Sequence, residues 1–137
     1  MTQIISRLGV AGMLDWQQAV WIAIHIGRAL DFAHKQRIIH RNTVPSNILV
    51  QNSDKLAKLG DLMLAKVLEG SMAQPITRPG ELVGDVDYMS PERMRGGSEV
   101  DGRSDIYSLG ATVYALLTGR PPSREVRWSK LSPKSDR

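Results

Sequence analysis

The sequence predicts a mainly α-helical fold that carries one short β hairpin. Residues 16–36 and 104–118 repeat apolar side chains at spacings of three and four, which is the period of a helix. Between them, residues 48–51 and 56–60 are short apolar runs separated by a polar turn, which indicates two hairpin strands. The chain of 137 residues, 42% of them hydrophobic, suffices for one globular domain.

The first predicted helix begins at Trp16, with Asp15 as its capping residue. It ends near Gln36, where Lys35 places positive charge at the negative end of the helix dipole. Its apolar face is wide enough to indicate burial on more than one side. The members of that face are Val20, Ile24, Gly27, Leu30 and Ala33–His34, flanked by Ile22, Ile26 and Ala29. Residues 1–14 form a partly ordered lead-in segment.

The second predicted helix opens at Ser104 and Asp105 and runs to about Thr118, with Gly119 as its stop signal. Its apolar residues surround it almost completely, which is typical of a central core helix. They are Ile106, Leu109, Val113, Leu116 and Leu117, with Tyr107 and Tyr114 beside them. Such a helix needs neighbours that cover it, so we expect a marginally stable monomer, or cover from a protein partner or a second copy.

Composition narrows the function classes. The chain has no cysteine, no apolar run long enough for a membrane span and no signal-peptide pattern, so we expect a cytoplasmic protein. The net charge of +4 arises from the six basic and two acidic side chains of residues 119–137. Residues 123–137 therefore form a basic, flexible tail. We do not expect nucleic acid as its partner, because only Trp128 interrupts the charges with an aromatic ring.

Five segments, in order, carry a resemblance to a known family. They are Ala29–His34, His40–Asn47, Asp61–Met63, Tyr88–Glu92 and Asp105–Gly110 together with Leu117–Pro122. In this order and spacing they resemble the first half of the large lobe of a protein kinase of the bacterial serine/threonine type. The resemblance runs from about residue 14 to residue 122. It implies three regions, which are a lead-in over 1–14, a partial large lobe over 15–122 and the tail.

The resemblance implies a phosphotransfer frame around the loop 40–47. His40, Arg41 and Asn47 match the family's H-R-D-L-x-x-x-N loop, and Asp61 stands where the family has the aspartate of D-F-G. Asn47 and Asp61 offer the oxygen ligands that Mg²⁺ prefers, and the resemblance adds Leu49 to the nucleotide site. The alternative is that Asn47 and Asp61 only hydrogen-bond the loop, and both interpretations stay open.

Three positions on this surface depart from the family. Asn42 replaces the catalytic aspartate, and an amide cannot accept a substrate proton. Val44 replaces the loop lysine, so no cation is present to neutralise the transferred phosphoryl group. Asp85 follows Gly84, where active members have a threonine. Met63 also replaces the glycine of D-F-G, which removes backbone freedom. Together these changes argue against chemistry at this loop.

Other residues of the resemblance have structural roles or remain open. We expect His40 to pack its ring under the loop, and Asp105 to cap its helix and hold the loop's backbone amides. Arg41 either binds a phosphorylated residue of segment 64–91, with Ser71 and Thr77 as candidate sites, or is an ordinary surface arginine. The family pairs Glu92 with an arginine further along the lobe.

Nothing in the sequence resembles a small lobe, because no G-x-G-x-x-G loop and no V-A-I-K lysine are present. The sequence therefore predicts a truncated, catalytically inactive pseudokinase that acts, if at all, through protein binding. We then expect no cofactor. The alternative is a serine/threonine kinase that uses ATP and Mg²⁺ and is weak or dependent on a separate small lobe. A basic binding module built on the tail is a third possibility.

Overall fold

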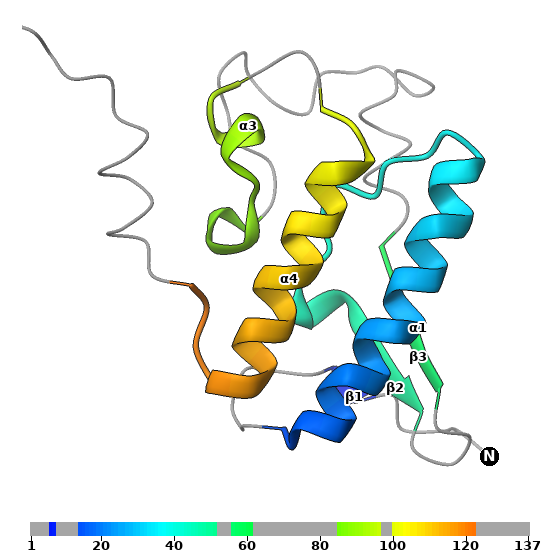
Figure 1. The fold of residues 1–137 in the computed structure, drawn as a ribbon, viewed down its shortest axis with the longest axis vertical. Helices are drawn as coiled ribbons and strands as arrows, with labels where there is room; N and C mark the ends of the chain where they lie inside the picture. Colours follow the sequence, from blue (N-terminus) through cyan, green and yellow to red (C-terminus); the bar gives the residue numbers. More distant parts are fainter. Residues whose placement is uncertain (1–5, 8–13, 52–55, 62–84, 97–99, 123–137) are drawn as a thin grey trace, which may run out of the picture.

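A computed structural model describes residues 6–7, 14–51, 56–61, 85–96 and 100–122. Two long helices pack side by side, and a small sheet lies against one of them (Figure 1). The predicted fold class, mainly α with a short hairpin, is confirmed. In chain order the elements are β1 (Ser6–Arg7), α1 (Trp16–Lys35), the 3₁₀ turn η1 (Pro45–Asn47), β2 (Ile48–Gln51), β3 (Leu56–Leu59), the 3₁₀ turn η2 (Val86–Tyr88), α3 (Pro91–Met94) and α4 (Gly102–Thr118).

Helix α1 begins where the sequence predicts. The Asp15 carboxylate accepts a hydrogen bond from the Gln18 backbone N–H at 2.9 Å, which satisfies one unpaired donor of the first turn. The predicted apolar face is wrong in part, because Val20 and Ile24 are 46% and 48% exposed. The buried residues are Ala19, Ile22, Ile26 and Leu30. The periodicity of the sequence predicted a broad apolar stripe on α1. Contact with the sheet and with α4 determines which side of this stripe is buried.

Helix α4 begins two residues earlier than predicted, at Gly102. Its N-cap is Asp101, whose carboxylate accepts from the Arg103 N–H at 2.9 Å, so the predicted capping role of Asp105 is wrong. The C-terminal end is as predicted. Gly119 has a left-handed φ of 76° and donates its N–H to the Ala115 carbonyl, which closes the helix.

The two sides of α4 differ from the expected all-round core helix. One side is buried and is made of small or polar residues together with one leucine: Ser104, Asp105, Ser108, Ala111, Thr112, Ala115 and Leu116. On the opposite side, large apolar residues are exposed: Ile106, Tyr107, Tyr114 and Leu117. Small buried residues let α1 and the loop segments approach the α4 backbone closely. The large apolar side chains on the other side are only partly covered in the described part of the chain, at 38–54% exposure.

The hairpin is antiparallel, with Leu49 opposite Lys58 and Val50 opposite Ala57. A two-residue strand, β1, pairs with the free edge of β2, so the lead-in contributes a strand that the sequence did not predict. Two residues are too few for a periodic signal. The central core joins the sheet to both long helices, and it contains Ala19, Ile22, Ile26, Leu30, Ile48, Val50, Ala57 and Leu116.

Two glycines of α4 provide a matched pair for testing this fold. We expect Gly119→Ala to destabilise the protein by about 1 kcal/mol, because alanine is strained at a left-handed φ. Gly110→Ala should stabilise it by about 0.5–1 kcal/mol, because a Cβ there meets nothing within 4 Å and alanine favours the helix. Urea unfolding of both variants measures the difference. Equal effects of the two substitutions would contradict the assigned helix end.

Candidate functional site

The loop 40–47 is anchored to α4 through the carboxylate of Asp105. This side chain is 1% exposed. Its Oδ2 accepts from the His40 backbone N–H at 2.9 Å, and its Oδ1 accepts from the Arg41 N–H at 2.8 Å. Because both bonds go to backbone amides, they fix the path of the loop whatever the neighbouring side chains are. Buried charge without such partners would be strongly destabilising.

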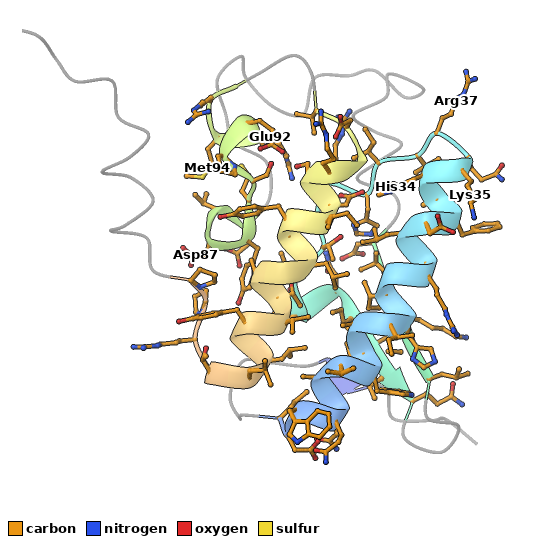
Figure 2. The ribbon with its side chains drawn as sticks, in the orientation of Figure 1. His34, Lys35, Arg37, Asp87, Glu92 and Met94 are labelled. Carbon is orange, nitrogen blue, oxygen red and sulfur yellow. The ribbon has the colours of Figure 1, made fainter. Side chains whose placement is uncertain are left out.

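His34 provides the third donor to Asp105. Its Nε2–H donates to Oδ2 of Asp105 at 2.8 Å, and Figure 2 shows His34 at the C-terminal end of α1, beside the N-terminal end of α4. The ring lies directly on Gly102, where a Cβ would come within 2.8 Å of ring atoms. His34 therefore ties α1, α4 and the loop together, and a glycine at 102 gives its ring room.

The His40 ring lies beneath the loop and is 1% exposed. Its Nε2–H donates to the Gly60 carbonyl at 2.7 Å, and its Nδ1 accepts from the Asn42 N–H at 3.3 Å. Both ring nitrogens are therefore occupied by backbone groups. With no nitrogen directed at solvent, the ring serves to connect the loop to the end of β3 rather than to transfer protons.

The backbone segments that carry Asn47 and Asp61 lie side by side. Asn47 donates its Nδ2–H to the Asn42 carbonyl at 2.9 Å, and its own carbonyl accepts from the Gly60 N–H at 2.7 Å. Asp61 follows Gly60 directly, is exposed and has a left-handed φ of 57°. The amide Oδ1 of Asn47 and the carboxylate of Asp61 are the two oxygen groups here that could hold a metal ion. Leu49 lies next to them, with its Cδ1 3.5 Å from the position of a Cβ on Gly60.

This pair of ligands fits Mg²⁺, which binds proteins through one or two carboxylates and takes water and phosphate oxygens for the rest. It does not fit a metal held by protein alone. Within the described ranges, no group of three or more His, Cys, Asp or Glu residues could hold a metal ion. When bound, Mg²⁺ would neutralise phosphate charge.

The side chain at position 44 is part of the core. Val44 is 4% exposed and belongs to a buried cluster with Tyr88, Ala111 and Ala115. A cationic side chain in this place would have to leave the cluster to reach a phosphate. Asn42 is half-buried, so its amide remains available at the loop surface.

Asp85 lies at the start of η2, on the element that packs on Val44. It is exposed, and its Oδ1 accepts from the Asp87 N–H at 3.2 Å. Burial raises the pKa of Tyr88 above its usual value, and the charges of Asp85 and then Asp87 raise it further. The carboxylate of Asp85 is therefore used as a turn cap beside a tyrosine hydroxyl.

Arg41 and Arg93 bring two guanidinium groups close together. Arg41 has a left-handed φ of 68°, and its Nε is buried without a hydrogen-bond partner in the described part of the chain. Arg93 donates from Nη1 to the Arg41 carbonyl. Burial, and then the charge of Arg41, lower the pKa of Arg93, while Asp105 opposes them. The pair has the chemistry of an anion site. The candidate phosphosites Ser71 and Thr77 lie outside the described residues.

A buried polar stripe on α4 completes the support of the loop, and the sequence analysis missed it. Thr112 donates to the Thr43 carbonyl at 3.0 Å, and Ser108 donates to the Tyr88 carbonyl at 2.7 Å. The hydroxyls of Ser104 and Ser90 lie 2.6 Å apart. The sequence contained a signal for this stripe, since these residues recur with Asp105 at spacings of three and four on an otherwise apolar helix.

Glu92 is half-buried in the first turn of α3.

Comparison with known proteins identifies the family. The model of the protein kinase domain matches residues 2–134. The chain is 40% identical over 111 residues to the serine/threonine-protein kinase PknB of Mycobacterium leprae, which covers 81% of this chain and 17% of the relative. It is 39% identical over 113 residues to a probable PknB of Bifidobacterium longum, covering 82% and 16%. It is also 39% identical over 111 residues to a probable serine/threonine kinase of Clostridium acetobutylicum, covering 81% and 16%.

The chain thus spans about a sixth of the length of these relatives. None of the helices in the described ranges combines the length and the apolar character that a membrane span requires.

The anchoring by Asp105 is open to a direct test. We expect Asp105→Asn to cost about 2–4 kcal/mol, because the amide carries no charge and turns an N–H toward one of three donors. Hydrogen exchange at the His40 and Arg41 amides should accelerate more than elsewhere. Asp101→Asn is the matched control, since asparagine caps a helix about as well as aspartate. A loss of stability at Asp101 equal to that at Asp105 would refute the anchoring role.

The contact between His34 and Gly102 predicts a coupled pair of substitutions. Gly102→Ala should destabilise the protein by about 1–3 kcal/mol, because the new methyl group overlaps the imidazole. In a His34→Ala background, the same substitution should cost far less. A double-mutant cycle followed by urea unfolding measures the coupling. Additive effects would show that the ring does not rest on residue 102.

Proposed function

This chain belongs to the protein kinase family, among the bacterial serine/threonine kinases, and we propose that it is a catalytically inactive member that acts by binding a protein. The observation that carries the proposal is the chemistry of the loop. Asn42 presents an amide at the base position, and Val44 is packed in the core at the lysine position. Phosphoryl transfer depends on positioning and charge stabilisation, and these two residues supply neither.

The absence of a carboxylate at Asn42 indicates how large the loss of catalytic rate would be. A general base contributes about 10²–10⁴-fold to a proton-transfer step. The described loop 40–47 contains no carboxylate that could substitute for the base. The carboxylate of Asp105 is occupied by the loop's backbone amides, and that of Asp85 is engaged as a turn cap. The missing lysine charge adds to this loss, because the developing charge on the phosphoryl group then lacks one stabilising cation.

Retention of the fold supports a binding role. Three donors hold Asp105, and Thr112 and Asn47 hold the carbonyls of Thr43 and Asn42. This support keeps the loop ordered although its chemistry is gone. The exposed apolar side of α4 offers a surface for a protein partner or for a second copy of the chain. Because the sequence lacks cysteine, we place this role in the cytoplasm.

A serine/threonine kinase is the second candidate function. It is favoured by the adjacent placement of Asn47 and Asp61, whose oxygens suit Mg²⁺ and hence ATP. Such an enzyme would be weak, or would need a separate small lobe to complete the nucleotide site. Arg41 with Arg93 would then bind a phosphorylated residue of the segment that follows Asp61, with Ser71 and Thr77 as candidates.

Activity and nucleotide binding distinguish the two functions. The purified chain should transfer no radiolabelled phosphate from Mg²⁺-ATP to a generic substrate protein, because the loop lacks its base and its cation. ATP with Mg²⁺ should also leave the melting temperature unchanged, since binding to the folded state alone would raise it.

Asp61→Ala is the control for both measurements. Phosphotransfer that this substitution abolishes would establish the chain as an active kinase and overturn the proposal. A saturable thermal shift that Asp61→Ala removes, without any phosphotransfer, would show that nucleotide binding survives in an inactive protein.

A further inference from the structure

Helix α1 carries a line of large side chains that the fold leaves exposed. Trp16 is 65% exposed, and Val20 and Ile24, which the sequence predicts to be buried, are about half exposed. Arg28, one further step along, is exposed as well. Because these four residues are spaced by four positions, they form one ridge about 18 Å long on the surface of the helix. We call them the α1 ridge.

The α1 ridge points away from the core, which contacts the other side of the helix through Ala19, Ile22 and Ile26. The N-terminal end of α1 lies beside the C-terminal end of α4 (Figure 1). There the Leu14 N–H donates to the Leu116 carbonyl at 2.9 Å. The next residue of α4, Leu117, is exposed and adds to the apolar surface at this end.

The exposed apolar area matches the lower limit for a specific dimer. An aromatic side chain carries about 150–250 Å² and an aliphatic one about 60–120 Å². Scaled by their exposed fractions, the apolar side chains of the α1 ridge together with Leu117 offer about 300 Å². An interface is about 60% apolar, so this area implies a contact of about 500 Å² per copy, or about 1,000 Å² in all, which is what a specific complex requires.

The order of side chains along the α1 ridge is complementary to itself. Two such ridges interdigitate when the helices cross at about −50°, the commonest packing of helices in globular proteins. With an antiparallel crossing between Val20 and Ile24, Val20 of each copy lies against Ile24 of the other. Trp16 of each copy then lies opposite Arg28 of the other, as a cation–π pair. A parallel crossing would instead bring the two Arg28 side chains together, and their like charges oppose it.

We propose that two copies of this chain associate through their α1 ridges, antiparallel, about a two-fold axis between Val20 and Ile24. The inference goes beyond the proposed function, because it assigns a contact between identical chains to α1 and does not involve the loop 40–47. The contact is small, so the dimer dissociates in the micromolar range.

Sedimentation equilibrium of the full chain tests this dimer. Val20→Glu and Ile24→Lys should each weaken association at least about tenfold, because each places two charges in an apolar contact. A mixture of the two variants should form a heterodimer again. In the antiparallel pairing, the introduced carboxylate meets the introduced ammonium group at one contact, and Val20 meets Ile24 at the other.

Phe32→Lys is the matched control, since Phe32 is 69% exposed on the same helix. It lies three helical steps of four residues beyond Val20, so it points about 120° away around the helix and falls outside the contact. This variant should dimerise like the unmodified chain. All three substitutions are at exposed positions, and circular dichroism should show the same folded helices in each variant.

An unmodified chain that stays monomeric at high micromolar concentration would overturn the proposal. So would a dimer that survives Val20→Glu or that Phe32→Lys weakens equally, and a mixture that fails to associate would refute the antiparallel pairing. The outcome is independent of catalysis. A dimer that transfers phosphate would remove the proposed function and leave this inference intact, and an inactive monomer would do the reverse.

Discussion

The loop of this protein depends on one buried carboxylate. Asp105 accepts hydrogen bonds from the amides of His40 and Arg41 and from the His34 ring, so α1, α4 and the loop converge on its two oxygens. A carboxyl group at 1% exposure is tolerated only with such donors around it. Arg41, which donates one of these bonds, has a left-handed backbone conformation. Gly102 is small because the His34 ring must approach this carboxylate closely.

The supports of the loop explain how it keeps its form with Asn42 and Val44 in place of the family's aspartate and lysine. Asp105 binds backbone amides, while Asn47 and Thr112 donate to the carbonyls of Asn42 and Thr43. None of these bonds uses a side chain at 42, 43 or 44. These hydrogen bonds therefore do not depend on which side chains stand at those three positions. A family motif that is retained in the sequence thus indicates that the loop backbone is held in place, more than that the loop is active.

Sequence reasoning predicted what local rules determine. The cap at Asp15, the hairpin, and the stop at Gly119 each depend on residues close in the chain. Sequence reasoning failed where contacts between residues far apart in the chain determine which side chains are buried. Periodicity did not show that Ile22 and Ile26 face the core while Ile24 faces outward, because the sheet that selects the side is formed later in the chain. The stripe of Ser108 and Thr112 was missed for the same reason, since its acceptors lie 20 and 69 residues away. The packing of Val44 against Tyr88 also joins distant segments.

The burial of Val44 has an evolutionary consequence if the chain is the inactive kinase proposed above. Once valine packs with Tyr88, Ala111 and Ala115, a return to lysine places a charge where the cluster now excludes water. Reversion of Asn42 to aspartate alone restores a base without its cation, and therefore gains little. Each single step back is thus neutral or harmful, and only a combined change would be favoured. In the inactive kinase proposed above, this hydrophobic contact would therefore make catalysis difficult to regain.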